Sequence, residues 1–178
     1  VSAEERSGLR ALQLALRALR SGELDAAIVG AVDFGRDELH QQALKELGIC
    51  RVNGDGAVVL VLQREKEATA SQNPILATVD ECIEVSSSSN VSELEERFGH
   101  SHAAFGLIAL LSEALSFRES KAQNETIVSV ASLGGVRDAV SIKPHWSSEN
   151  FSLGPTPLGQ GPHLRMPAHG SKLSSGDF

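Results

Sequence analysis

The stretch "GLRALQLALRALRSGELDAAIVGAVDF" (residues 8–34) joins the pattern of an amphipathic helix to that of a strand. Leucines recur at helical spacing through its first half, and Gly22 stands where a helix commonly ends. The following run, "DAAIVGAVDF" (25–34), is nearly all apolar, which is typical of a strand buried on both faces. A helix followed directly by a buried strand predicts a layered α/β fold.

The residues before this stretch give the expected start of the helix. Ser2 is followed three positions later by Glu5, the spacing of a capping box. In that motif the two side chains satisfy backbone N–H groups at the start of a helix. We therefore expect the helix to begin near Ala3.

The same two patterns continue along the chain. We expect a polar helix over 36–49, then a turn over 53–56 that leads into a β-branched strand from Ala57 to Leu62. The remaining expected elements are a strand over 75–85, a polar connection with a single helical turn over 86–99, a buried helix over 102–120 and a hairpin over 125–144 that turns at Gly134-Gly135. Residues 144–178 hold five of the six prolines and show no periodicity.

Composition narrows the class of protein. A chain of 178 residues with 41% hydrophobic and 22% charged residues is typical of one soluble globular domain. The formal net charge of −7 argues against a nucleic-acid partner, and no apolar run is long enough for a membrane span. Cys50 and Cys82 form no CxxC or metal-like spacing, so we expect free thiols and a cytoplasmic protein. Since the chain opens at Val1 without an initiator Met, we interpret it as a fragment or an excised domain.

Four segments form an ordered set: "GLRALQLALRALRSGELDAAIVGAVDF" (8–34), "NGDGAVVLVLQREKEA" (53–68), "FGHSHAAFGLIALLSEAL" (98–115) and "VSVASLGGVRDAVSI" (128–142). In this order they resemble the β-ketoacyl synthase family, which has the thiolase fold and condenses acyl chains on carrier proteins. The first looks like the family's nucleophile helix and central strand. The others are similar to its "GDGAxVLVLKRLxDA", "IGHxEAAAGxxGLLKAxL" and "SFGGTNAHVVL" motifs.

The resemblance implies a thiolase-like layered α/β/α segment, with buried helices against a mixed sheet. It covers residues 2–142 and is similar to the C-terminal portion of such a domain. We therefore expect a partial ketosynthase-like domain over residues 1–143. Over 144–178 we expect a Pro/Gly/Ser-rich linker or disordered tail.

When the family's motifs are aligned with this sequence, most of the family's catalytic residues are replaced by other residue types. The family's nucleophilic Cys lies in "DTACSSSL", and the corresponding position here is Glu5 in "SAEERSGL". A carboxylate is a poor acyl acceptor, whereas condensation through a thioester needs a thiolate. The family's "HGTGT" histidine has no counterpart, its Lys before "SNIGH" aligns with Glu95, and Val136-Arg137 stand at the Thr-Asn of "GGTN". His100 falls on the surviving second histidine, which in the family helps to polarise the malonyl thioester.

This combination is similar to the chain-length-factor type of subunit, found in polyunsaturated fatty acid and polyketide synthases. The resemblance implies a non-condensing partner domain that helps to shape the acyl tunnel of an active ketosynthase. Its expected partners are a ketosynthase domain or subunit, in an association of the dimer type, and an acyl carrier protein. We expect no cofactor and no metal; the phosphopantetheine arm of the carrier protein would carry the substrate. Two alternatives remain: a residual malonyl-thioester decarboxylase or acyltransferase that uses His100, and an inactive truncated remnant.

The candidate site residues also have simpler interpretations. Glu5 is either a capping-box carboxylate or a substitute for the thiolate charge that promotes malonyl decarboxylation without condensation. His100 either lines a catalytic pocket or is an imidazole at a helix start, hydrogen-bonded to a backbone carbonyl. His102 suggests polar packing at the helix N-terminus. A metal site at His100 and His102 would need further ligands, and His40 or Cys82 would join only through the tertiary fold.

Overall fold

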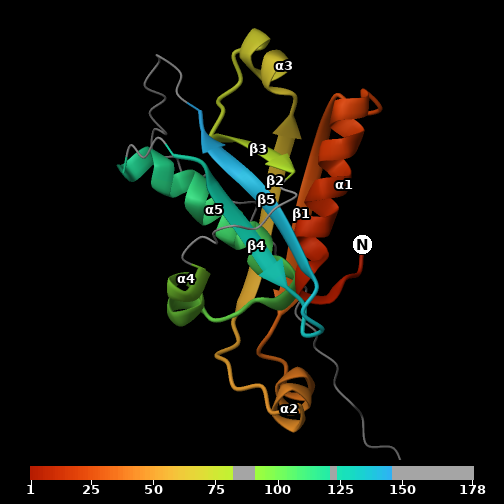
Figure 1. The fold of residues 1–178 in the computed structure, drawn as a ribbon, viewed down its shortest axis with the longest axis vertical. Helices are drawn as coiled ribbons and strands as arrows, with labels where there is room; N and C mark the ends of the chain where they lie inside the picture. Colours follow the sequence, from red (N-terminus) through yellow and green to blue (C-terminus); the bar gives the residue numbers. More distant parts are fainter. Residues whose placement is uncertain (82–90, 121–123, 146–178) are drawn as a thin grey trace, which may run out of the picture. The chain divides into compact units, whose positions relative to one another are not determined.

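The computed structural model describes residues 1–81, 91–120 and 124–145. They belong to one compact unit, Val1–Ser147, shown in Figure 1. The helical elements are a 3₁₀ turn η1 (Glu4–Arg6), α1 (Ser7–Ser21), α2 (Glu38–Glu46), α3 (Glu65–Ala70), α4 (Val91–Phe98) and α5 (His102–Ser120). The strands are β1 (Ala26–Phe34), β2 (Asp55–Gln63), β3 (Ala77–Glu81), β4 (Thr126–Ala131) and β5 (Arg137–Pro144).

The end of α1 follows the expectation and its start does not. Gly22 adopts φ 78°, and the N–H groups that follow α1 bond back to Ala18 and Leu19, which closes the helix. The expected capping box at Ser2 and Glu5 is wrong: no side chain caps η1, and Glu5 is fully buried instead. Its carboxylate pairs with Arg51 instead, and the helical region opens as η1, with α1 beginning at Ser7.

β1 and β2 form a two-stranded antiparallel sheet, with Ile28 opposite Val61 and Gly30 opposite Val59. The expectation that the first strand is buried on both faces is wrong for the described residues. Exposure alternates along both strands, because α1 and α5 cover one face. The outer face presents large exposed apolar side chains: Ile28, Val32, Phe34, Val59 and Val61.

The second sheet has the order β3–β5–β4, and both pairs are antiparallel. The expected hairpin is confirmed: β4 pairs with β5, and Gly135 adopts φ 79° in the turn. Both sheets of the described chain are thus antiparallel, not mixed as expected. The strand expected over 75–85 is β3; its residues from 82 onward, like the expected tail over 146–178, lie outside the described residues.

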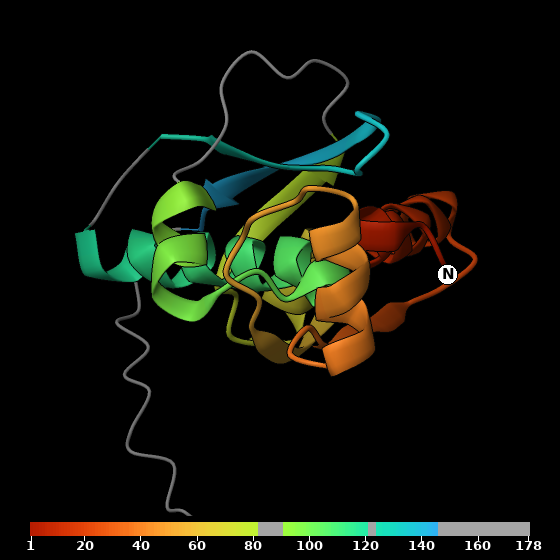
Figure 2. The same cartoon turned by 90° about the horizontal axis from the view of Figure 1, so that it is seen from below.

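The long helices α1 and α5 lie between the two sheets. α5 contacts β1 and β2 on one side and β4 and β5 on the other, and it packs against α1. Figure 2 shows the same order, with the β4–β5 hairpin and β2 on opposite sides of the helices. The layered α/β fold is confirmed, but the layers of the described residues run sheet, helices, sheet. Helices covering the outer faces, as an α/β/α order requires, are not formed by this part of the chain.

The core is aliphatic, as the low aromatic content requires. The four leucines of α1 at helical spacing, Leu9, Leu12, Leu16 and Leu19, are buried, whereas Leu14 is exposed. In α5 the buried residues gather in the first half of the helix, where the sequence is apolar on nearly all sides as expected. The fully buried large apolar side chains are Leu9, Leu12, Leu107, Val128, Val140 and Ile142. Two local differences are small: α4 is two turns long rather than one, and Pro144 belongs to β5. None of the described helices combines the length and apolarity that crossing a membrane requires.

Candidate functional site

The carboxylate of Glu5 is the starting point of the candidate site, because it stands at the nucleophile position of the resemblance. Its side chain is 0% exposed, and its Oε1 accepts a hydrogen bond from Arg51 Nη2 at 3.2 Å. Its Oε2 has no hydrogen-bond partner among the described residues. A buried charge of this kind needs a compensating charge, and Arg51, itself 15% exposed, supplies it.

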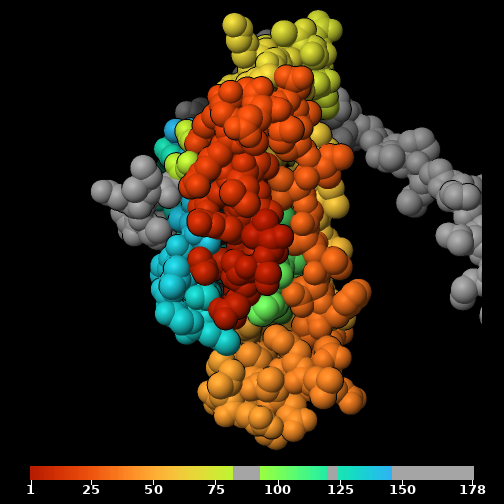
Figure 3. Space-filling view, turned by 90° about the vertical axis from the view of Figure 1, so that its right-hand side faces the viewer, coloured from red at the N-terminus to blue at the C-terminus, as the bar shows by residue number. Residues whose placement is uncertain are grey.

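A second contact fixes η1 on the C-terminal sheet. Arg6 and Arg10 donate to the two carboxylate oxygens of Asp138, at 3.0 and 3.5 Å. Asp138 belongs to β5 and is almost fully buried. Figure 3 shows the N-terminal residues between the β4–β5 hairpin and the segment that follows β1. Two parts of the chain that are distant in sequence, the loop before β2 and β5, therefore hold η1 and the start of α1.

Arg51 comes from the loop before β2, and the same loop binds the backbone of His100. The His100 N–H donates to the Val52 carbonyl at 2.8 Å, and the Gly54 N–H donates to the His100 carbonyl at 3.1 Å. These contacts form a parallel bridge between Asn53 and His100. The loop was expected to be only a turn into a strand, but it joins Glu5, Arg51 and His100 in one cluster.

The close approach of these two loops depends on glycine. A Cβ added to Gly54 would lie 2.1 Å from the Phe98 carbonyl oxygen, which real Cβ atoms do not tolerate. Gly99 adopts φ 77°, and its Cβ would lie 2.7 Å from the Asn53 carbonyl carbon. Two glycines therefore permit the backbone contact that carries His100 to the cluster.

The imidazole of His100 is buried and neutral at pH 7. It stacks on Phe105, with 4.3 Å between ring centroids. Its pKa is lowered to about 4, chiefly by burial and next by the nearby positive charge of Arg51, while the carboxylate of Glu5 opposes the shift. Its Nδ1 accepts the backbone N–H of His102 at 3.1 Å, so the proton of the neutral ring lies on Nε2. The expected bond to a backbone carbonyl is wrong: the ring binds a backbone N–H.

His102 begins α5 and packs against polar groups, in line with the simpler interpretation. Its Nδ1 lies 3.2 Å from Asp33 Oδ2, and the same oxygen accepts the Ala103 N–H at 3.2 Å. The His40 ring meets the His102 ring edge-on, with 5.1 Å between centroids. Although His40 does come close, residues 1–81, 91–120 and 124–145 hold no group of three or more His, Cys, Asp or Glu side chains that could bind a metal ion.

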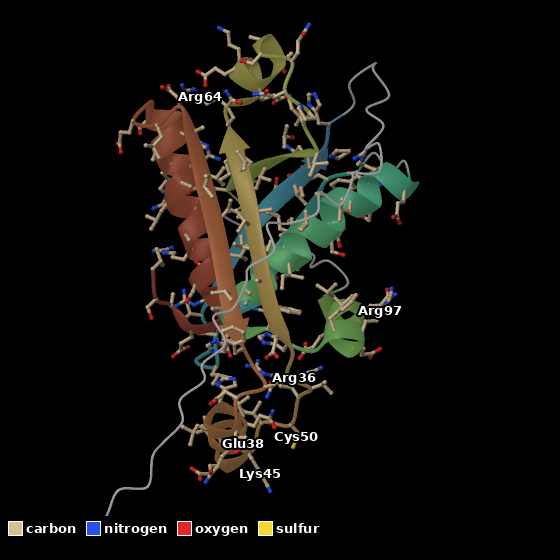
Figure 4. The ribbon with its side chains drawn as sticks, turned by 180° about the vertical axis from the view of Figure 1, so that it is seen from behind. Arg36, Glu38, Lys45, Cys50, Arg64 and Arg97 are labelled. Carbon is tan, nitrogen blue, oxygen red and sulfur yellow. The ribbon has the colours of Figure 1, made fainter. Side chains whose placement is uncertain are left out.

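Among the described residues, no cysteine joins the cluster of Glu5, Arg51 and His100 as an alternative nucleophile. Cys50 is exposed, and Figure 4 places it beside α2, near Glu38 and Lys45. Cys82 lies outside the described residues. Val136 in the hairpin turn and Arg137 at the start of β5, which the resemblance places at the family's Thr-Asn positions, are both exposed. Sequence reasoning missed Arg51 and Asp33. The signal for Arg51 would have been Glu5, because a carboxylate that is buried there needs a cation from elsewhere in the chain.

The arrangement defines what the cluster can do chemically. It offers a carboxylate paired with Arg51, at the position that the resemblance assigns to the nucleophile, and an imidazole whose Nε2–H can donate a hydrogen bond. A hydrogen-bond donor polarises a carbonyl oxygen, but it forms no covalent acyl intermediate.

Comparisons with known proteins agree with the resemblance. Residues 1–53 match the model of the "Beta-ketoacyl synthase, N-terminal domain". The matched model is that of the N-terminal domain, so the expected C-terminal portion does not describe residues 1–53. No curated protein matches the chain.

Solved structures with the same fold include several ketosynthases. An oxazolomycin ketosynthase domain of Streptomyces albus JA3453 is 18% identical, with a TM-score of 0.63 over 84% of this chain and 46% of that chain. A type II polyketide synthase ketosynthase, in complex with its acyl carrier protein and bound to a hexaketide, is 12% identical, with a TM-score of 0.66 over 82% and 62%. The ketosynthase of module 6 of the bacillaene synthase from Bacillus subtilis 168 is 14% identical, with a TM-score of 0.63 over 81% and 46%.

This chain spans less than two thirds of each of these three structures. The fold match extends over most of the chain, while the family model covers its first 53 residues. The first 53 residues thus match the family's N-terminal domain, and most of the chain has the fold of these ketosynthases, as the resemblance implies.

Proposed function

We propose that this chain is a non-condensing, ketosynthase-like partner in acyl-chain assembly. The observation that carries the proposal is the buried Glu5–Arg51 ion pair at the position of the family's nucleophile. A condensing subunit needs a thiolate there, because the growing chain is transferred to sulfur. Transfer to Glu5 would form a reactive anhydride. Arg51 opposes that step as well, because its hydrogen bond stabilises the carboxylate.

The proposed partners are an active ketosynthase and an acyl carrier protein. One neighbour of the same fold was solved as a ketosynthase with its acyl carrier protein, and this chain spans only part of such a protein. In the proposed role it packs against an active ketosynthase, in an association of the dimer type, and borders the acyl tunnel. The chain-length-factor role is part of what we propose for this chain, and so are its place in acyl-chain assembly and any catalytic activity that it retains.

The test is a condensation assay with purified protein and acyl- and malonyl-carrier-protein substrates. The chain alone should give no β-ketoacyl product, and adding it to an active ketosynthase should change the length distribution of that enzyme's products. The Glu5→Cys variant should also fail to condense alone, because restoring a thiol does not restore the missing "HGTGT" histidine. Robust product from the wild-type chain alone would overturn the proposal.

A residual malonyl-thioester decarboxylase is the second candidate, and the state of His100 favours it. The ring is neutral and its Nε2–H is available as a donor, which suits a thioester oxygen that gains negative charge as CO₂ leaves. CO₂ release from malonyl-carrier protein should then fall at least tenfold in His100→Gln. His145→Gln is the matched control, because His145 pairs with Glu65 rather than with the Glu5–Arg51–His100 cluster. Equal release by wild type and both variants would exclude this candidate.

An inactive truncated remnant is the third candidate, favoured by the exposed apolar face of β1 and β2. A remnant of this kind should lack a cooperative thermal transition in isolation. A single sharp unfolding transition of the 178-residue chain would count against it.

A further inference from the structure

The centre of the outer face of the β1–β2 sheet is apolar. In the antiparallel register, Ile28 lies opposite Val61 and Val32 lies opposite Ala57, so the two members of each pair share a face. The large apolar side chains of this face are 60% to 76% exposed: Ile28, Val32, Phe34, Val59 and Val61. A strand face that stays in contact with water usually carries charged residues that prevent association. This face has none between its two ends.

The two ends of the same face are polar. Asp55 stands at one end, where its Oδ1 accepts the Arg36 N–H at 3.1 Å. Gln63 stands at the other end, where its Oε1 accepts a hydrogen bond from Asn73 Nδ2 at 2.8 Å. An apolar centre with a polar rim is the arrangement that protein–protein interfaces show. The apolar centre therefore ends where the two strands end.

The described part of the chain leaves this face uncovered. α1 and α5 pack against the opposite face, where Val29 and Val58 join the core. Figure 4 views the sheet from its outer face, with no described helix in front of it. Among the described strands, β1 and β2 pair only with each other, so no third strand extends the sheet. The large side chains of the outer face are therefore accessible to another molecule.

The chemistry of the face favours a second copy of this chain as its occupant. A different protein would be selected by charges or hydrogen-bonding side chains, and the centre of this face offers neither. An apolar face is complementary to itself, as a two-fold symmetric interface requires, because the same patch contributes from both copies. Two sheets pack face to face in this way in β-sandwiches, with their side chains interdigitating.

The size of the face is sufficient for a dimer only when both partners contribute it. At about 100 Å² for each large apolar side chain, the five exposed side chains supply about 500 Å² per copy and about 1,000 Å² in a pair of copies. A specific interface needs about 1,000 Å² in total. A partner without a matching apolar face would leave the apolar area at half of that value.

We propose that two copies of this chain associate through the outer faces of their β1–β2 sheets. The apolar centres meet, and the polar residues at the strand ends stay at the rim of the interface. This inference goes beyond the proposed function, which names an active ketosynthase as the partner and assigns no surface to that contact.

The test is analytical sedimentation of the purified 178-residue chain over a series of protein concentrations, with folding checked by circular dichroism. The wild type should form a dimer whose population rises with concentration. Ile28→Glu and Val61→Glu should each weaken the dimer by roughly tenfold or more, because they place unpaired carboxylates in the interface. Leu39→Glu is the matched control: its side chain is 77% exposed, close to the 76% of Ile28, but it lies on α2. Its dimer should be as stable as that of the wild type.

Salt distinguishes this apolar interface from a charged one. The wild-type dimer should persist at high salt, because salt screens charges but does not weaken apolar burial. A wild-type chain that stays monomeric at every concentration would overturn the proposal, and so would a dimer that dissociates in salt. A dimer that the folded Ile28→Glu and Val61→Glu proteins leave unchanged would overturn it as well, because another surface would then carry the contact.

A milder variant keeps the proposal testable if neither Glu variant folds. Val61→Thr preserves the shape of the side chain and adds only a hydroxyl, so it should fold and form a weaker dimer. An unchanged dimer of Val61→Thr would then count against the proposal. Since neither a ketosynthase nor a carrier protein enters these measurements, their failure is distinct from failure of the proposed function.

Discussion

The Glu5 carboxylate and the Arg51 guanidinium form a buried ion pair, with 3.2 Å between Oε1 and Nη2. The two residues are 46 positions apart in the chain. Their contact joins the start of the first helix to the loop that also binds the backbone of His100. The pair is therefore a structural link, and it stabilises the carboxylate that stands where the resemblance places the nucleophile.

Arg51→Met should destabilise the protein by about 3 kcal/mol, because it leaves a buried carboxylate without its counter-charge. Urea unfolding followed by circular dichroism measures the change. Arg17→Met is the matched control: Arg17 pairs with Glu81 on the surface, and an exposed pair contributes about 1 kcal/mol or less.

The double variant Glu5→Leu/Arg51→Met checks the same interpretation. Replacing both charges with apolar groups removes the unpaired carboxylate, so much of the lost stability should return. A double variant as unstable as Arg51→Met alone would show that the loss came from packing rather than charge.

Protonation of His100 should make stability depend on pH below neutrality. The unfolded chain binds this proton near the ordinary pKa of about 6.5, whereas the folded protein binds it only near pH 4. The unfolded state therefore holds more protons between these two values. The contribution is up to about 3 kcal/mol, fully present above pH 6.5 and lost as the pH falls toward 4.

Unfolding free energies measured from pH 7 down to pH 4 test this dependence, with His100→Gln as the comparison. The variant cannot take up the proton, so its curve should be flatter over this range. Parallel curves for the two proteins would contradict the low pKa of His100.

Gly8→Ala should weaken the contact between α1 and α5. A Cβ at this position would lie 2.7 Å from the Ala103 carbonyl oxygen and 3.0 Å from Leu107 Cγ, so the helix backbones must move apart. We expect a loss of about 1–3 kcal/mol, as for other overpacked core positions. Gly134→Ala is the control, because its nearest neighbour would be Ser132 Oγ at 3.8 Å. A shift in melting temperature confined to Gly8→Ala is the expected result.

The outer face of the β1–β2 sheet should affect association more than stability. Val59→Thr and Val61→Thr change side chains that are 66% and 75% exposed, so each should alter the unfolding free energy by no more than about 0.5 kcal/mol. Both should reduce self-association, measured by light scattering, because they interrupt an exposed apolar patch. Val58→Thr, on the buried face of the same strand, should instead destabilise by about 1–3 kcal/mol, because its hydroxyl is buried.

Much of the fold follows from local sequence. The leucine spacing predicts α1, Gly22 its end, the apolar run 102–120 the bounds of α5, and Gly134-Gly135 the hairpin turn. Each of these signals acts within one helix or one turn, so it needs no knowledge of distant residues. The sequence also identified Glu5 and His100 as the residues to examine, through the family motifs that contain them.

The tertiary structure decided which residues these groups meet. A capping box was a sound local prediction for Glu5, but a buried Arg51 from another loop takes its carboxylate instead. Asp33 reaches His102 across 69 residues, and no periodicity predicts that contact. The strand over 25–34 has the composition of a strand buried on both faces, yet only one face is covered by the described residues. Local patterns determine helices, strands and turns because backbone preferences are short-range; partners, burial and protonation depend on which distant segments converge when the chain packs.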